Sequence, residues 1–284
     1  MKWTERGETF HREGGPAAEA RLLHIEPQRL IERWAASSHS KFVVWDVGFG
    51  AAGNALAAVG ALRSQLESLS SERLDGEIHS FDQTTAPVEF ALKHANDLDY
   101  LNGHHEILRL LLRDHRVDIV PGLTWRLHLG DFRQLLDTPS SSHSCSALSE
   151  KIKNDLEAPD AILYDPYSPV GNAEMWTLDH FTNLFQRLEP SRPCLLTNYT
   201  RSTAVRVALL LSGFSVGVGC SVGEKAETTI ASNCFSLLER PLDLKWLERV
   251  KGSGNAAPLR SPIYSQSRIS PEDLERLKGC SQFS

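Results

Sequence analysis

The sequence predicts an α/β protein whose core is a Rossmann-like, doubly wound and mostly parallel sheet of seven strands. Apolar, strand-like runs alternate with helix-like stretches through the middle of the chain. A glycine-rich turn follows the first of these runs, and four aspartates stand where predicted strands end. The last strand is expected to be antiparallel, because the loop from Gly219 to Gly223 before it is too short for a helical crossover.

The individual elements follow from the apolar periodicity along the chain. A small β element is expected at Thr9 to His11 and Ala20 to Ile25, with a helix at 27–36 after it. The strands of the sheet are predicted at 42–47, 77–82, 124–129, 160–165, 193–199, 214–219 and 227–237. The helices are predicted at 53–70, 86–101, 104–114, 174–188 and 201–212.

Segments of biased composition suggest how the chain is organised. The Ser-rich stretch Pro139 to Ser149 indicates a flexible insertion. The Gly/Pro/Ser-rich stretch Gly252 to Pro262 indicates a loose linker, and a short helix is expected at Pro271 to Leu277. The predicted organisation is therefore a cover element over 1–40, a central domain over 41–240 and a C-terminal tail over 241–284.

Composition narrows the classes of function. No apolar stretch approaches the roughly 20 residues that cross a bilayer, so a membrane role is not expected. The N-terminus lacks a secretory signal, and the five cysteines are scattered without metal-ligand spacing, which favours reduced thiols in the cytoplasm and no metal. The net charge of −6 provides no global field for nucleic acid, so DNA is not expected, although a local basic patch would suffice to dock a folded RNA.

The glycine-rich turn is the first candidate ligand site. The strand ending at Val47 leads into Gly48-Phe49-Gly50-Ala51-Ala52-Gly53-Asn54 and then into an Ala- and Leu-rich helix. Glycines let the backbone approach a ligand closely, and a helix N-terminus supplies oriented N–H groups. Asp46, two residues before the first glycine, favours S-adenosylmethionine over a dinucleotide, because no pyrophosphate must then be cradled.

Three further acids follow later strands. Asp82 ends the second strand, a position from which a carboxylate accepts hydrogen bonds from both ribose hydroxyls. Asp131, followed by Phe132, is placed to accept from an adenine amino group, although for this residue taken alone a helix N-cap is the favoured explanation. Asp165 ends the strand Ala161 to Tyr164 in a turn bracketed by two prolines, which brings its carboxylate to the carboxyl edge of the sheet where ligands bind. Together the four acids suit a sulfonium cofactor that carries an ammonium group.

Over most of residues 7–235 the chain resembles a known family, the S-adenosylmethionine-dependent methyltransferases of tRNA wobble 5-aminomethyl-2-thiouridine. The family comprises the N-terminal domain of bifunctional MnmC and its stand-alone, MnmD-like relatives. The resemblance rests on the glycine loop with Asn54, on Asp82, on Gly130-Asp131 and on Asp165 to Thr177. In the last segment Asn172, Met175, Trp176 and Thr177 match in register. Three residues depart from the family pattern: Pro166 replaces a glycine, and Gly171 and Ala226 replace basic residues.

The resemblance implies a class I methyltransferase domain over 41–240 and roles for individual residues. Asp165 is the expected catalytic residue, which orients the amine and takes up its proton. Tyr167, Tyr199, Arg206 and Lys225 are expected to bind the tRNA, Arg206 and Lys225 through phosphates, although a solvated surface position fits these two basic residues equally. Met175 and Trp176 are expected in the core. The expected cofactor-binding residues are Asp46, Gly48, Phe49, Gly50, Asn54, Asp82, Asp131 and Phe132.

Three other functions fit parts of the same pattern. A methyltransferase for another amine or small molecule fits the lost basic residues. A nicotinamide-dependent oxidoreductase fits the glycine turn alone, and a catalytically silent binding module fits the proline after Asp165. Protection from thermal unfolding by S-adenosylhomocysteine or by NADH separates the two cofactor classes.

Overall fold

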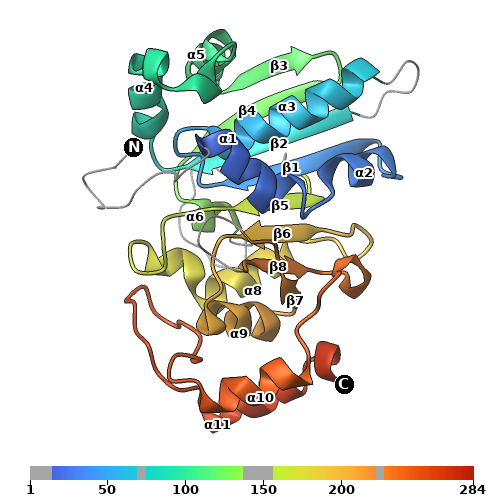
Figure 1. Ribbon diagram of the computed structural model, residues 1–284, viewed down its shortest axis with the longest axis vertical. Coiled ribbons are helices and arrows are strands. Elements are labelled where there is room, and N and C mark those ends of the chain that lie inside the picture. The colour runs from blue at the N-terminus through green and yellow to red at the C-terminus, as the bar shows by residue number, and fades with distance from the viewer. Residues whose placement is uncertain (1–14, 69–74, 137–155, 222–226) are drawn as a thin grey trace, which may run out of the picture. The chain divides into compact units, whose positions relative to one another are not determined.

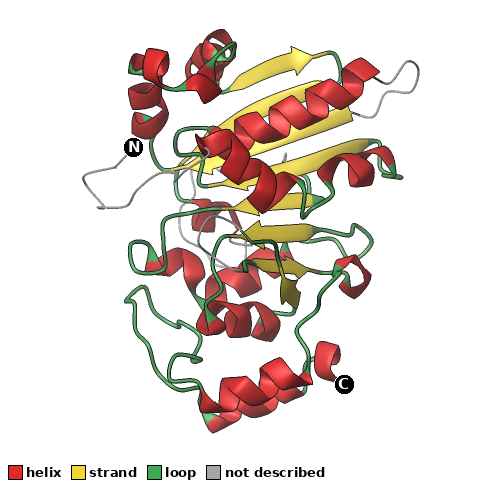
Figure 2. Ribbon diagram, viewed as in Figure 1, coloured by secondary structure: helices red, strands yellow, loops and turns green. Residues whose placement is uncertain are grey.

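The computed structural model describes residues 15–68, 75–136, 156–221 and 227–284. The chain divides into two compact units, each of which combines helices and strands (Figures 1 and 2). Unit 1 comprises Met1–Phe132, Pro159–Asp165 and Ser221–Ala226. Unit 2 comprises Arg133–Ala158, Pro166–Cys220 and Glu227–Ser284. In the described ranges no helix combines the length and apolarity that a bilayer span requires.

Unit 1 is built on five strands in the order β3-β4-β2-β1-β5. β1 pairs in parallel with β2 and with β5, and β2 pairs in parallel with β4, whereas β3 is antiparallel to β4. This arrangement brings the carboxyl ends of β1, β2, β4 and β5 to one edge. The strands are β1 (Lys41–Val47), β2 (Asp75–Asp82), β3 (Arg116–Val120), β4 (Leu123–Leu129) and β5 (Ala161–Tyr164).

Helices of unit 1 cover one face of these strands with an apolar core. α3 follows the glycine turn and packs its alanines and leucines on Val44 and Ile78, which are fully buried. On the other face Phe132 lies edge-on to Trp45 at 6.0 Å between ring centroids. The helices are α1 (Gly15–Ala20), the π-helix η1 (Arg21–Ile25), α2 (Leu30–Ala35), α3 (Gly53–Ser68), α4 (Ala86–Lys93), the 3-10 turns η2 (Ala95–Asp97) and η3 (Asp99–Leu101), α5 (His105–Asp114) and α6 (Phe132–Leu136).

Unit 2 contains three strands, in which the central β8 is antiparallel to both β6 and β7. The strands are β6 (Leu195–Asn198), β7 (Ser215–Val218) and β8 (Thr229–Ser232). The helices are η4 (Ala173–Trp176), α8 (Leu178–Gln186), α9 (Thr203–Leu211), η5 (Phe235–Leu237), α10 (Leu244–Gly252), α11 (Pro271–Lys278) and η6 (Ser281–Phe283). The antiparallel pairing predicted for the last two strands is confirmed.

The α/β class is confirmed, and several elements need correction. Eight strands are present in the described residues instead of seven, because Arg116–Val120 forms β3. Residues 20–25 are helical: Ala20, Leu23 and His24 are buried at helical spacing, whereas a strand would bury alternate residues. The predicted strand at 9–11 and insertion at 139–149 lie outside the described residues.

Two long predicted helices are interrupted, and the tail is better packed than expected. The helix predicted over 86–101 ends as α4 at Lys93, and 3-10 turns follow it. The helix predicted over 174–188 is split at Thr177, whose hydroxyl caps α8 by accepting from His180 N. The stretch 252–262 is not a loose linker, since Leu259 is 5% exposed and its carbonyl accepts from Leu178 N at 2.8 Å. The predicted boundaries at 40 and 240 stay predictions.

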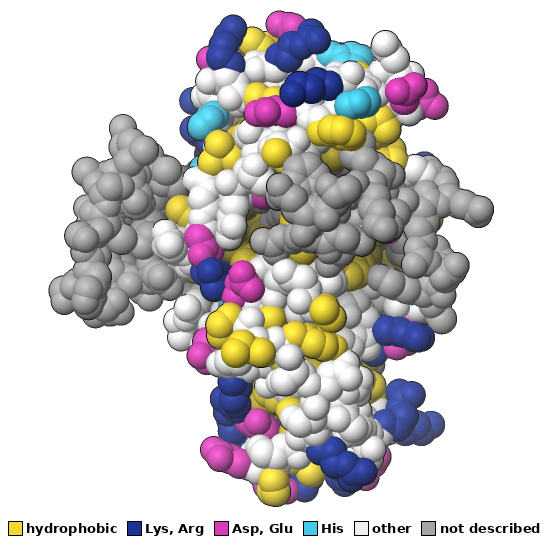
Figure 3. All heavy atoms as spheres, turned by 90° about the vertical axis from the view of Figure 1, so that its left-hand side faces the viewer, with side chains coloured by type: hydrophobic (Ala, Val, Ile, Leu, Met, Phe, Trp, Pro, Cys, Tyr) yellow, Lys and Arg dark blue, Asp and Glu magenta, His cyan; other side chains and the backbone are white. Residues whose placement is uncertain are grey.

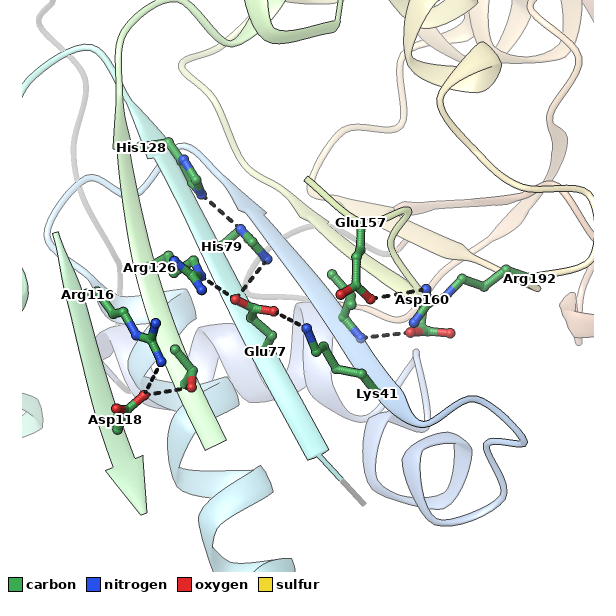
Figure 4. A network of polar contacts seen from close by, with 12 residues as sticks. Lys41, Glu77, His79, Arg116, Asp118, Arg126, His128, Glu157, Asp160 and Arg192 are labelled. Carbon is green, nitrogen blue, oxygen red and sulfur yellow. Dashed lines mark hydrogen bonds and ion pairs between the residues drawn. The ribbon is translucent and has the colours of Figure 1, made fainter. Parts of the chain in front are cut away.

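A polar network crosses the face of unit 1 that carries Glu77 and His79 (Figure 4). Glu77, on β2, accepts a hydrogen bond from Lys41 Nζ at 2.8 Å and forms an ion pair with Arg126. His79, two residues along the same strand, lies 2.8 Å from His128 between Nδ1 and Nε2. Burial opposes the ionisation of Glu77, but the hydrogen bonds from Lys41 and Arg126 outweigh it and bring its pKa to about 2.

The substitution Glu77→Gln is expected to lower the free energy of unfolding by about 1–2 kcal/mol at pH 7, because both cationic partners lose a charged acceptor. A folded-state pKa of about 2, against 4.5 ordinarily, makes this contribution complete above pH 4.5 and removes it as the pH falls toward 2. Urea unfolding at pH 7 and pH 3 measures the difference. The exposed Glu32→Gln serves as control, and a gap that stays constant between the two pH values contradicts the assignment.

Candidate functional site

The turn after β1 has the backbone shape that requires glycine. Gly48 and Gly50 adopt φ angles of 97° and 51°, in the left-handed region that other residues avoid. The N–H groups of Gly48 and Phe49 both donate to the carbonyl of Phe81 at 3.1 Å, which joins the turn to the end of β2. The turn leads directly into α3 at Gly53. The structure therefore contains the strand, turn and helix that the sequence predicted for a cofactor loop.

Asp82 links the end of β2 to the glycine turn and to the residue before Asp131. Its Oδ2 accepts from Gly50 N at 2.9 Å and its Oδ1 accepts from Gln83 N at 2.7 Å. Its backbone carbonyl accepts from Gly130 N at 2.9 Å, which places the residue before Asp131 beside the end of β2. These bonds hold the Asp82 carboxylate at the end of β2, the position from which a carboxylate accepts from ribose hydroxyls in nucleotide-binding folds.

Asp46 is fully buried and has one oxygen in use. Its Oδ2 accepts from Ser80 Oγ at 2.7 Å, and Ser80 Oγ in turn accepts from Trp125 Nε1 at 2.9 Å. In the described part of the chain its Oδ1 has no hydrogen-bond partner. Burial raises the pKa of Asp46 to about 7 against the bond from Ser80, and the charges of Asp165 and Asp82 act in the same direction as burial. A buried acceptor without a donor indicates that a ligand group completes this site.

Asp165 joins the same edge from β5. Its backbone N–H donates to Val47 O at 2.9 Å, and its Oδ2 accepts from Asn54 Nδ2, in the first turn of α3, at 2.8 Å. The charges of Asp165 and Asp82 both act on Asp46, so three of the predicted acids share one electrostatic environment. Asp165 is the last residue of its segment in unit 1, and Pro166 begins unit 2.

Asp131 and Phe132 follow β4 at the same edge of unit 1. The ring of Phe132 packs against Phe81 at 4.8 Å between centroids and against Trp45 at 6.0 Å. Because Asp131 is adjacent in the chain, this packing of Phe132 fixes where its backbone lies. Eight predicted cofactor residues and Asp165 are thus all in unit 1.

These residues fit S-adenosylmethionine. The orphaned oxygen of Asp46 offers an acceptor for an ammonium group, the glycine turn admits close backbone approach, and Asp82 stands at the strand end where a carboxylate would meet the ribose. Asp131 and Phe132 would hold the adenine. Three interacting carboxylates also favour a ligand with net positive charge.

The predicted substrate residues belong mainly to unit 2. The indole of Trp176, which is fully buried, donates to Tyr167 O at 2.8 Å and lies edge-on to the ring of Tyr199 at 5.8 Å. Trp176 therefore holds the two tyrosines in one arrangement, and its predicted place in the core, with that of Met175, is confirmed. Lys225 lies outside the described residues.

Arg206 differs from the exposed phosphate contact that was expected. Its side chain is only 4% exposed. Its guanidinium donates to Thr229 Oγ1, Glu227 Oε1 and Thr228 O at 3.0, 3.0 and 2.9 Å. Burial is the main cause that lowers the pKa of Arg206. All three guanidinium nitrogens thus bind α9 to Thr229 of β8 and to the two residues before that strand, and this leaves Arg206 buried instead of exposed to a phosphate.

Sequence reasoning missed the residues that support the acids. Ser80 and Trp125 hold Asp46, and the hydroxyl of Tyr100 donates to the carbonyl of Ala51 in the glycine turn at 3.0 Å. Ser80 had a signal, since it is a small polar residue two positions before the end of a predicted strand, and it pairs in register with Asp46. Trp125 and Tyr100 had no such signal in the sequence, because an aromatic residue in a strand or turn ordinarily belongs to the hydrophobic core.

The pKa of Asp46 predicts the pH dependence of one variant. The folded-state pKa of about 7 exceeds the ordinary 3.8, so the stability from the bound proton is complete below pH 3.8 and is lost as the pH rises through 7. The side chain that Asp46→Asn introduces does not ionise. The melting temperature of the variant minus that of the wild type is therefore expected to be larger at pH 8 than at pH 5. Thermal unfolding at both pH values measures this difference, with Asp97→Asn as control. The same difference in melting temperature at both pH values would contradict a raised pKa of Asp46.

Comparison with known proteins supports the same class. Residues 104–234 match a family model described as S-adenosyl-L-methionine-dependent methyltransferase. The tRNA 5-methylaminomethyl-2-thiouridine biosynthesis bifunctional protein MnmC of Leptospira interrogans is 27% identical over 237 residues, which cover 81% of this chain and 33% of that protein. The MnmC protein of Aromatoleum aromaticum is 30% identical over 228 residues, which cover 73% of this chain and 30% of that protein.

The crystal structure of MNMC2 from Aquifex aeolicus is similar in fold, with a TM-score of 0.65 at 23% identity over 97% of this chain and 78% of that one. The chain spans about a third of the length of the curated MnmC proteins that it matches. The Rossmann-like fold and the cofactor predicted from the sequence are confirmed, and the nicotinamide alternative is not supported. The chain is an S-adenosyl-L-methionine-dependent methyltransferase, and it is similar over 73–81% of its length to MnmC proteins.

Proposed function

We propose that this methyltransferase acts on the aminomethyl group of 5-aminomethyl-2-thiouridine at the wobble position of tRNA. The observation that carries the proposal is Asp165, which is held at the carboxyl edge of unit 1 by Asn54 and by Val47 O. The names of the MnmC relatives, which refer to 5-methylaminomethyl-2-thiouridine in tRNA, support the acceptor.

Asp165 has the chemistry that an amine acceptor requires. An aminomethyl nitrogen is largely protonated at neutral pH and has no free lone pair until it loses a proton. A carboxylate that accepts hydrogen bonds from this nitrogen orients it and takes up the proton. S-Adenosyl-L-methionine, when bound, supplies an electrophilic methyl group. The amide of Asn54 fixes one oxygen of Asp165, so the carboxylate is oriented before the amine arrives.

Tyr167 and Tyr199 are our candidates for contact with the uracil. Both rings are half-buried, and in unit 2 Trp176 bonds to the backbone carbonyl of Tyr167 and lies edge-on to the ring of Tyr199. An aromatic ring that is half-exposed and rigidly supported is suited to stack on an unstacked base. Tyr167 is two residues from Asp165 along the chain, so the two side chains belong to the same turn.

The surface charge favours local rather than broad contact with RNA. On the face shown in Figure 3 the Lys and Arg side chains of the described residues lie among Asp and Glu side chains. The overall charge of −6 agrees with this mixture. A tRNA would therefore be held by a few phosphate contacts, and its affinity should fall with salt by a correspondingly small slope.

A panel of acceptors tests the proposal against a second methyltransferase function. Initial rates of methyl transfer are measured with tRNA that carries the aminomethyl group, with fully modified tRNA and with a set of small primary amines. We expect transfer only to the first tRNA. Transfer to small amines without transfer to this tRNA would instead establish the alternative acceptor, which the family departures Gly171 and Ala226 favour.

A further inference from the structure

A pocket of about 470 Å³ lies in unit 2 at the start of α11, and its lining includes none of the residues expected to bind the cofactor. Its wall is formed by the segment before α11 and by the first turns of that helix. The lining is polar: four serines and three arginines contribute to it, with only two acids, Glu272 and Asp273. The formal charge of the lining is therefore positive by one.

A buried carboxylate holds two of the arginines in place. Asp273 is 5% exposed, and its Oδ1 accepts from Arg260 Nη2 at 2.6 Å and from Arg276 Nη1 at 3.4 Å. The backbone N–H of Asp273 donates to Ser270 Oγ at 3.0 Å, which fixes the acid at the helix start. The two arginine side chains remain 52% and 47% exposed, so each guanidinium turns part of its surface to solvent.

The arginines keep donors for a ligand. A guanidinium has five N–H donors, and the bonds to Asp273 use one nitrogen of Arg260 and one of Arg276. Arg268 lines the same pocket, is exposed, and forms no hydrogen bond or ion pair with the described residues. Planar guanidinium groups match the oxygens of a phosphate, and serine hydroxyls add neutral donors. The pocket is thus suited to a phosphate group.

The segment beside the pocket also carries exposed apolar surface. Ile263 and Tyr264, between the lining residues Ser261 and Ser265, are 73% and 38% exposed. The amide of Gln266 donates to the Tyr264 hydroxyl, which leaves the faces of the ring available. A ring beside a phosphate site is the combination that binds a nucleotide of RNA through its backbone and its base.

We propose that the pocket formed by Arg260, Arg268 and Arg276 binds a backbone phosphate of the RNA substrate, with Tyr264 beside it for a base. This inference rests on the proposed tRNA acceptor. It adds an RNA contact in the C-terminal part of unit 2, outside residues 104–234 that match the methyltransferase family model. The contact contributes affinity without taking part in methyl transfer.

Binding of tRNA to the full chain over a series of KCl concentrations tests the contact. Arg268→Ala is expected to weaken binding roughly tenfold and to lower the slope of log affinity against log salt by about one. Affinity for S-adenosylhomocysteine and the rate at saturating tRNA should stay unchanged. Arg109→Ala, which removes an exposed arginine of α5 in unit 1, is the matched control. Equal affinities and slopes for the two variants would overturn the proposal.

Asp273→Asn tests whether the arginines must be oriented. The variant keeps the shape of the side chain and removes a negative charge, so simple electrostatics predicts tighter RNA binding. Orientation by Asp273 predicts weaker binding despite the added net positive charge. Tighter RNA binding by a variant with an unchanged melting temperature would contradict the claim that Asp273 orients the arginines for a phosphate.

Inorganic pyrophosphate separates this proposal from the proposed function. The Nε resonances of the arginines are followed by NMR during a pyrophosphate titration, with Arg268→Ala to assign them. If the Arg268 resonance is perturbed by pyrophosphate but the protein does not bind tRNA, the pocket is a site for a free phosphate. This result would overturn the proposal that the phosphate belongs to RNA. No perturbation and no effect of Arg268→Ala on tRNA binding would overturn the site altogether.

Discussion

Asp165→Ala is expected to lower the rate of methyl transfer by about 10²- to 10⁴-fold, the range that a positioned acid or base contributes. The loss arises because the acceptor nitrogen has no carboxylate to orient it and to take its proton. The affinity for S-adenosyl-L-methionine should change by less than about fivefold, since every residue expected to bind the cofactor is kept in the variant. Single-turnover rates and calorimetric binding measure the two quantities separately.

Two variants make this result specific. Asp165→Asn keeps the size of the side chain and can still contact Asn54, yet it cannot take a proton, so it should be nearly as slow as Asp165→Ala. Asp97→Asn removes an exposed acid of unit 1 and should retain the full rate. A fast Asp165→Asn enzyme would show that the carboxylate is dispensable, and the role assigned to Asp165 would then be wrong.

Asp82→Ala is expected to weaken the binding of S-adenosyl-L-methionine by about 3 kcal/mol, or roughly 100-fold. The variant removes the carboxylate proposed for the ribose hydroxyls, and it also frees the N–H groups of Gly50 and Gln83 that this carboxylate holds. Both losses act on the same cofactor loop. Calorimetric titration with S-adenosylhomocysteine measures the effect without turnover.

The control for Asp82 lies at the other end of the same strand. Asp75 begins β2 and is exposed, so Asp75→Asn changes the charge of the strand without touching the cofactor edge. It should bind the cofactor as the wild type does. If Asp75→Asn and Asp82→Ala weakened binding equally, the effect would be one of net charge and the ribose contact would be refuted.

Much of the architecture of unit 1 could be predicted because parallel strands are buried on both faces. β1 and β5 are continuous apolar runs whose ends are marked by Gly48 and by Pro166, so both the strands and their carboxyl edge are visible in the sequence. β3 was missed because Arg116 and Asp118 alternate with apolar residues on an edge strand, a weaker pattern. The N-terminal segment was misjudged because its buried residues, Ala20, Leu23 and His24, repeat at helical spacing over too short a length.

The site was predictable at the strand ends and not beyond them. Asp46, Asp82 and Asp165 follow apolar runs, and parallel topology alone brings them to one edge. The supports come from contacts between segments distant in sequence, which no local pattern reports. Ser80 on β2 donates to Asp46 and accepts from Trp125 on β4, and Trp176 contacts the carbonyl of Tyr167 and the ring of Tyr199. The burial of Arg206 is likewise set by its partners on β8, whose positions follow from the tertiary fold.

Mass spectrometry of wobble nucleosides tests the central claim most directly. Purified protein and S-adenosyl-L-methionine are incubated with tRNA that carries 5-aminomethyl-2-thiouridine, and the nucleosides are analysed after digestion, with Asp165→Asn in parallel. We predict conversion of this nucleoside to its N-methylated form by the wild type and almost none by the variant. An unchanged wobble nucleoside in the presence of a wild-type protein that binds the cofactor would contradict the account.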